Sequence, residues 1–61
     1  MNEHTISPRT LAPGRIVVDL EDGSIALVRI PNSLTPEQAL DLADALLDAR
    51  AVAMLAMAVK A

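Results

Sequence analysis

Two short runs of β-branched and apolar residues lie on either side of an Asp-Gly pair in the first half of the chain. They cover about residues 15–20 and 25–30. Asp22-Gly23 between them is typical of a two-residue type I′ turn, because both central residues of that turn need positive φ. We therefore predict a β-hairpin whose turn sets the register. The expected pairs are Leu20 with Ile25, Val18 with Leu27 and Ile16 with Arg29, with Ile16, Val18, Leu20, Ile25 and Leu27 forming the core face.

The second half of the chain is patterned as one long helix. Thr35 is a suitable N-cap, Pro36 suits the first helical position, and Gln38 completes a Thr-x-x-Gln capping box. Ala, Leu and Met, which are strong helix formers, dominate the rest of the chain. We predict a helix over about residues 36–60. Its acidic residues recur at helical spacing and form one solvated stripe, made of Glu37, Asp41, Asp44 and Asp48.

Residues 51–59 are apolar throughout, which is unusual for a surface helix. A helix that is apolar all round must be covered all round. A six-residue strand spans about 20 Å, whereas a helix of this length spans about 36 Å, so the hairpin covers only part of it. We therefore predict a homodimer or higher oligomer joined through the helices, with alanines permitting close approach. The expected interface residues are Leu47, Ala49, Ala53, Met54, Leu55, Ala56, Met57 and Val59.

The length and composition support this prediction. The chain has 61 residues, no cysteine and no aromatic residue, so it forms one small domain without disulfides. Chains this short usually need a staple or an oligomer to be stable. Residues 1–14 show no periodicity and contain two prolines, which predicts a flexible or loosely docked arm. The domain is then a ββα unit over residues 15–61, of the α+β class.

The charge balance limits the classes of partner. The net charge is −3 and the five basic residues form no run, which disfavours a generic nucleic-acid-binding protein, because such affinity comes largely from Lys and Arg on phosphates. The chain starts without the basic and apolar regions of a secretory signal. Its apolar run is shorter than the roughly 20 residues of a membrane span. A cytoplasmic protein without membrane contact is expected.

Candidate chemistry is sparse. His4 is the only histidine, and the serines lie in predicted loops without a nearby base, so no catalytic residue, cofactor or metal site is predicted. The acidic stripe could hold a hard cation, but it lacks the loop carbonyls usual in such sites. It is either simply solvated or it engages a basic surface on another protein. Arg15 and Arg29, at the open end of the hairpin, are candidate anion-binding residues, although ion pairing with nearby carboxylates also explains them.

The stretch from Val17 to Arg50 resembles small uncharacterised proteins of actinobacteria and their phages. The resemblance lies in the Asp-Gly strand turn, in Ile30-Pro31 and in the segment Leu34-Thr35-Pro36-Glu37-Gln38-Ala39. It implies a hairpin followed by a capped helix and carries no activity.

Three functional hypotheses are compatible with these patterns. The first is a non-enzymatic inhibitor or adaptor, of phage or mobile-element origin, that associates with itself and binds another macromolecule, most simply a protein. The second is a dimeric DNA-binding regulator or antitoxin-like protein that presents Arg9, Arg15 and Arg29 to phosphate. The third is a sponge that holds a small anionic ligand between subunits.

Overall fold

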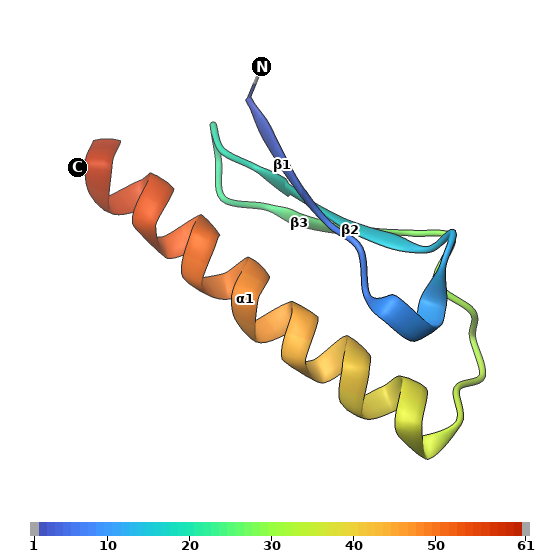
Figure 1. Ribbon diagram of the computed structural model, residues 1–61. Helices are drawn as coiled ribbons and strands as arrows, with labels where there is room; N and C mark the ends of the chain where they lie inside the picture. Colours follow the sequence, from blue (N-terminus) through green and yellow to red (C-terminus); the bar gives the residue numbers. More distant parts are fainter. Residues whose placement is uncertain (1, 61) are drawn as a thin grey trace.

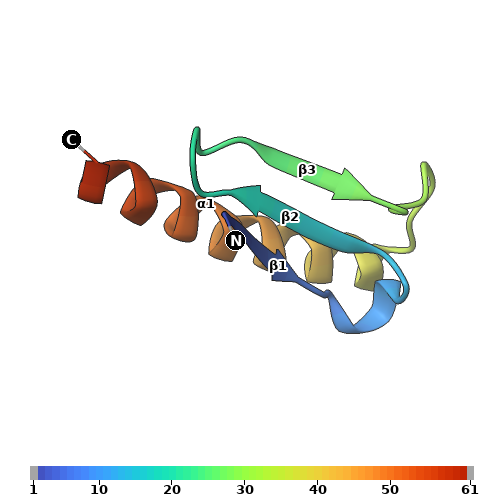
Figure 2. The same ribbon diagram turned by 90° about the horizontal axis from the view of Figure 1, so that it is seen from above.

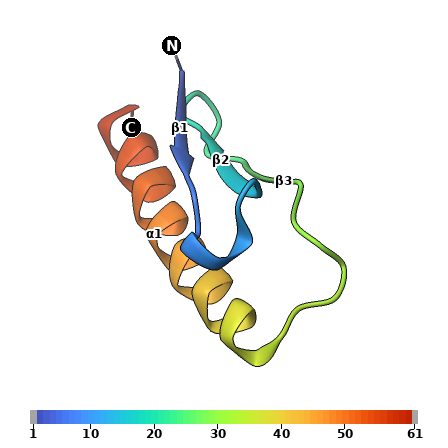
Figure 3. The same ribbon diagram turned by 45° about the vertical axis from the view of Figure 1, so that its right-hand side comes forward.

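The fold is a three-stranded antiparallel sheet with one long helix on one face. This computed structural model describes residues 2–60; Met1 and Ala61, the outer ends of the predicted arm and domain, lie outside that range. The sheet order is β1-β2-β3 and the helix α1 comes after the sheet in the chain (Figures 1 and 3). The predicted α+β class, hairpin and C-terminal helix are confirmed. The elements are β1 (Glu3–Ile6), a 3₁₀ turn η1 (Arg9–Leu11), β2 (Arg15–Asp19), β3 (Ile25–Val28) and α1 (Pro36–Lys60).

The core lies between the central strand β2 and the middle of α1. Ile16 and Val18 have no exposed surface, and they face a row of alanines on the helix. Small side chains at these positions allow α1 to approach the sheet closely, so the two β-branched residues fill the space between the layers. The alanine row consists of Ala45, Ala49 and Ala53.

The start of α1 has the predicted capping box. The backbone N–H of Gln38 donates to Thr35 Oγ1 at 3.1 Å, and the backbone N–H of Thr35 donates to Gln38 Oε1 at 3.0 Å. Two amide groups that lack partners at a helix N-terminus are thereby satisfied. The predicted bounds of about 36–60 are confirmed by the observed helix Pro36–Lys60.

The predicted hairpin register is wrong by two residues. Val18 pairs with Ile25 and Ile16 with Leu27. The turn covers residues 20–23 and is closed by Asp19, whose N–H donates to Ser24 O at 2.8 Å and whose O accepts from Gly23 N at 2.8 Å. Within residues 2–60, Gly23 and Arg29 have positive φ and Asp22 does not, so a type I′ turn does not form.

Side-chain hydrogen bonds explain the longer turn. Asp19 Oδ1 accepts from the N–H of Glu21, and Asp22 Oδ1 accepts from the N–H of Ser24. Such bonds stabilise a turn that the Asp-Gly pair alone does not specify. Because a slip of two residues preserves the alternation of side chains, Ile25 and Leu27 still face the helix layer.

The prediction of a flexible arm over residues 1–14 is also wrong. Residues 3–6 form the edge strand β1, which pairs with β2 from Glu3 opposite Asp19 to Ile6 opposite Ile16. Ile6 packs against the core, and Leu11 in η1 is buried at 4% exposure. The backbone pairing extends to Leu20, whose N–H donates to Asn2 O at 2.7 Å.

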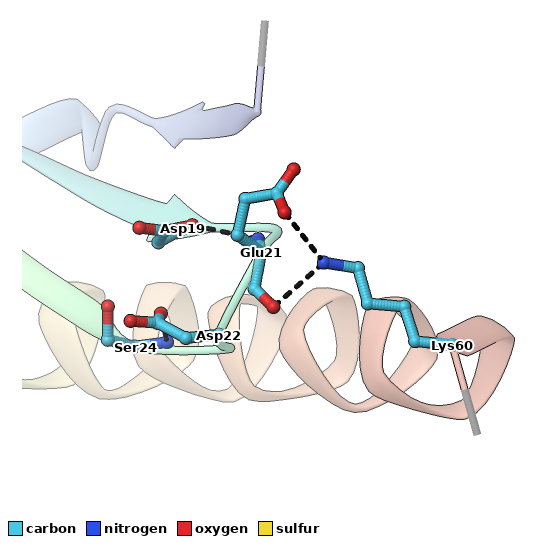
Figure 4. A network of polar contacts seen from close by, with 5 residues as sticks. All are labelled: Asp19, Glu21, Asp22, Ser24 and Lys60. Atoms are coloured by element: carbon cyan, nitrogen blue, oxygen red, sulfur yellow. Dashed lines mark hydrogen bonds and ion pairs between the residues drawn. The ribbon is translucent and has the colours of Figure 1, made fainter.

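Contacts from the sheet layer extend to the C-terminal end of α1. The strand length had predicted that the hairpin covers only part of the helix, so this prediction is wrong. Lys60 Nζ donates to the backbone oxygen of Glu21 at 2.8 Å and lies 3.2 Å from Glu21 Oε1 (Figure 4). A β-carbon built on Gly23 would lie 3.1 Å from Met57 Cγ. The β2–β3 turn therefore extends the cover beyond the strands themselves.

Candidate interaction surface

An exposed apolar surface lies between β3 and α1. Ile25 and Leu27 face the helix layer, yet they are 39% and 52% exposed. Beside them on the helix, Met54 is 54% exposed, and it lines an apolar hollow together with Ile25, Met57 and the β2–β3 turn. A monomer of this size rarely leaves so many large apolar side chains together in water.

The widths of the two layers explain this exposure. A helix is about 10 Å across, whereas three strands about 4.8 Å apart form a sheet roughly 14 Å wide. Figure 2 shows α1 running beneath the sheet with β3 to one side of it. One helix cannot cover all three strands, and β3 is the strand that overhangs.

The exposed surface of α1 that includes Met54 and turns away from the sheet repeats every seven residues. Leu40, Leu47 and Met54 share this surface, and their exposed fractions are 65%, 64% and 54%. Ala43, Arg50 and Met57 occur three residues after each of them. The two sets have the spacing of the a and d positions of a coiled-coil seam. Arg50, which also lines the hollow, is the one charged residue in the repeat.

The predicted interface residues do not share one face. Ala49 and Ala53 are buried against β2 at 0% and 7% exposure, so they cannot reach a second chain, and this part of the prediction is wrong. Close approach through alanines does occur, but it serves the sheet of the same chain. The others divide between two sides of the helix. Met54 and Met57 line the hollow beside β3, whereas Leu55, Ala56 and Val59 line a separate hollow with Leu20 and Val52. Leu47 is 64% exposed and lines neither hollow.

The acidic stripe has one member with a structural role. Asp41 Oδ2 accepts hydrogen bonds from the hydroxyl of Thr10 at 2.6 Å and from its backbone N–H at 2.7 Å. These bonds fasten η1 to α1, and with the nearby positive charge of Arg9 they hold the pKa of Asp41 below its usual value. The other members, Glu37, Asp44 and Asp48, are exposed on the helix.

Asp41→Asn is expected to weaken the η1 contact at neutral pH and to leave it unchanged in acid. Because the folded-state pKa of Asp41 is lowered, its contribution to stability is present above the unfolded-state pKa of about 3.9 and is lost as pH falls through the folded-state value. Thermal unfolding of wild type and variant from neutral pH to about pH 2 tests this. The melting temperatures should differ at pH 7 and converge in acid. A constant difference across the range would contradict the assignment.

The arginines named from the sequence gather at the end of the sheet away from the β2–β3 turn. Arg15 begins β2 opposite Val28, and Arg29 directly follows Val28 with φ of 60°. Arg9 lies in η1, which joins β1 to β2 at this same end (Figure 1). Glu21, one of the carboxylates near these arginines in the sequence, pairs with Lys60 instead.

The outer face of the sheet, away from α1, carries a carboxylate pair that sequence reasoning missed. Glu3 and Asp19 lie directly opposite each other, and both line a polar hollow with Glu21. Like charges at directly opposed positions destabilise a sheet by a few tenths of a kcal/mol or more. The pair was not predicted because residues 3–6 were not assigned to a strand.

Within residues 2–60, no group of three or more His, Cys, Asp or Glu side chains is arranged to hold a metal ion. His4 is exposed on β1, opposite Val18. Over the same residues, α1 lacks the length of apolar sequence needed to cross a membrane. Comparison of the chain with protein-family models, curated proteins and solved structures finds no match.

Proposed function

We propose that this protein is a non-enzymatic interaction protein that associates with itself and modulates another macromolecule. The observation that carries the proposal is the apolar surface formed by Ile25 and Leu27 on β3 and by Met54 on α1, all more than a third exposed. Water contact with these side chains is unfavourable by about 25 cal/mol per Å². A second copy that covers them leaves the acidic flank of α1, on the other side of the helix, free to meet a basic surface of a target.

Met54→Asp tests this proposal by placing a charge in the apolar surface. Since the wild-type side chain is about half exposed, we expect the variant to stay folded. Wild type should sediment as a dimer at micromolar concentration, and Met54→Asp should sediment as a monomer with unchanged helical circular dichroism. A desolvated unpaired charge at an interface costs several kcal/mol, which corresponds to a loss of affinity of a hundredfold or more.

Leu55→Asp is the matched control. Leu55 is the next residue along the helix and is 68% exposed, but it lies on the other side of α1. The Leu55→Asp variant should therefore remain a dimer. A wild-type chain that remains a monomer at these concentrations, or a Met54→Asp variant that remains a dimer, would overturn the proposed role of this surface.

DNA binding is the second candidate, and the gathering of Arg9, Arg15 and Arg29 at one end of the sheet favours it. Such binding would weaken steeply as salt is raised, because each phosphate contact releases a counterion. Titration of duplex DNA in low and moderate salt separates the two candidates. Absence of binding in low salt would remove the second one.

A further inference from the structure

The two edges of the sheet differ in how they are protected. β1 carries Glu3 and His4 and is followed by Pro8, all of which discourage another strand from pairing with it. β3 reads Ile-Ala-Leu-Val, with neither a charge nor a proline. Natural proteins rarely leave such an edge open. The β3 edge borders the same exposed apolar surface that faces the helix layer.

We propose that the β3 strands of two copies pair antiparallel across a two-fold axis at Ala26, which joins the two sheets into one six-stranded sheet. This proposal rests on the proposed function, since it specifies how the self-association occurs. The axis is perpendicular to the sheet, so both helices lie on the same side. The side of α1 that carries Met54 and Met57 then faces the same side of the other helix.

The hydrogen-bond pattern of the hairpin fixes which groups are available. The N–H of Asp19 donates to Ser24 O, which places this pair at a hydrogen-bonded position of the ladder. Hydrogen-bonded and non-hydrogen-bonded pairs alternate along an antiparallel ladder. Ala26 therefore bonds to β2, whereas the N–H and C=O groups of Ile25 and Leu27 point out of the open edge.

These outward groups determine the register between the two copies. Ile25 of one chain pairs with Leu27 of the other, and the reverse pair is required by the symmetry, giving about four backbone hydrogen bonds. A register shifted further along the strand would need Arg29, but Arg29 has φ of 60° and so leaves the extended conformation. Ala26 then meets itself across the axis in a non-hydrogen-bonded pair, where Cα atoms are about 4.5 Å apart. A small side chain suits that approach.

The widths of the layers also fit two copies better than one. Two helices side by side are about 20 Å wide and lie under six strands about 29 Å wide, where the overhanging β3 strands form the centre. Ile25 and Leu27 then lie above the space between the two helices. A stable interface removes about 800 Å² from each partner, which is less than a fifth of the 4340 Å² surface of this chain. The helix flanks and the β3 face together supply a large apolar part of it.

Ala26→Cys gives a direct test, because the chain has no other cysteine. The Cα separation of about 4.5 Å expected at the axis lies within the range that a disulfide spans. Under mild oxidation, most of the Ala26→Cys protein should shift to dimer mass on a non-reducing gel. The same variant in urea should remain monomeric. Circular dichroism of the Ala26→Cys variant serves as the check that this exposed substitution leaves the fold intact.

Ser24→Cys is the matched control, since residue 24 is also exposed on β3's side of the turn. In the proposed register, Ser24 lies opposite Val28 of the other chain, about 14 Å from its own symmetry mate. Ser24→Cys alone should not cross-link, whereas Ser24→Cys with Val28→Cys should. Equal cross-linking of Ala26→Cys and Ser24→Cys would overturn the pairing.

The outcomes separate this inference from the proposed function. If wild type sediments as a dimer but Ala26→Cys does not cross-link, self-association stands and the β3 pairing is wrong. If wild type is monomeric, both are wrong. If Ala26→Cys cross-links and Met54→Asp abolishes the cross-link, the strand edge and the helix flank belong to one interface.

Discussion

Replacing Ala49 by leucine is expected to lower the free energy of unfolding by about 3 kcal/mol, the upper part of the usual range for overpacking a filled core. Ala49 has no exposed surface and lies at the centre of the alanine row that faces Ile16 and Val18. Three additional carbon atoms can be accommodated only if α1 moves away from the sheet. A chain of this size has a total stability of about 3–9 kcal/mol, so the substitution should remove a third of it or more.

Ala51→Leu provides the comparison. It makes the same change on the same helix at an exposed position, where leucine is nearly as good a helix former as alanine. Its effect on stability should stay within about 0.5 kcal/mol. Urea unfolding followed by circular dichroism, at one fixed protein concentration because self-association contributes to stability, measures both variants. Equal midpoints would show that the alanine row is not the packing surface between the layers.

The elements that were predicted correctly are those with local signals. Thr35 and Gln38 mark the start of α1 through hydrogen bonds made within four residues, and the β-branched runs mark the two hairpin strands. The register was wrong because it depends on the side chains of Asp19 and Asp22, which compete with the Asp-Gly pair in setting the turn. Which of these interactions sets the turn depends on its geometry, and the residue types alone do not reveal it.

The N-terminal strand was missed because its signal is not local. Only Ile6 in β1 is apolar, since an edge strand needs just one residue against this core. Its stability comes from pairing with a strand some ten residues away and from the bond between Thr10 and Asp41, which are 31 residues apart. Neither contact leaves a periodic pattern in the first 14 residues.

Only part of the candidate surface could be predicted, because the rest depends on contacts between segments that are distant in the sequence. The seven-residue spacing of Leu40, Leu47 and Met54 is visible in the sequence. The sequence does not show which alanines the sheet would bury, because that depends on the side from which the sheet approaches the helix. Without β1, the hairpin has no fixed position over α1. The exposure of Ile25 and Leu27 arises only from a third strand that moves β2 to the centre of the sheet.

Gly14→Ala is expected to be the second severe substitution, at about 2–3 kcal/mol. A β-carbon at Gly14 would lie 2.7 Å from the Leu11 oxygen, 2.8 Å from the Arg29 oxygen and 2.9 Å from Ile30 Cδ1. Two of these atoms belong to the backbone, and the Leu11 oxygen also accepts a hydrogen bond from the N–H of Gly14 at 2.6 Å. No side-chain rotation can relieve the clash, so either η1 or the segment after β3 must move.

Gly23→Ala distinguishes this clash from the loss of a glycine as such. Gly23 has φ of 77°, which costs an alanine about 1–2 kcal/mol, but its close neighbour is the flexible end of Met57, which can move. Gly14→Ala should therefore have the lower urea midpoint of the two. If relief comes from displacement of η1, the bond from Thr10 to Asp41 is lost as well. Adding Asp41→Asn to Gly14→Ala should then have little further effect at pH 7, whereas full additivity would place the movement in the segment after β3.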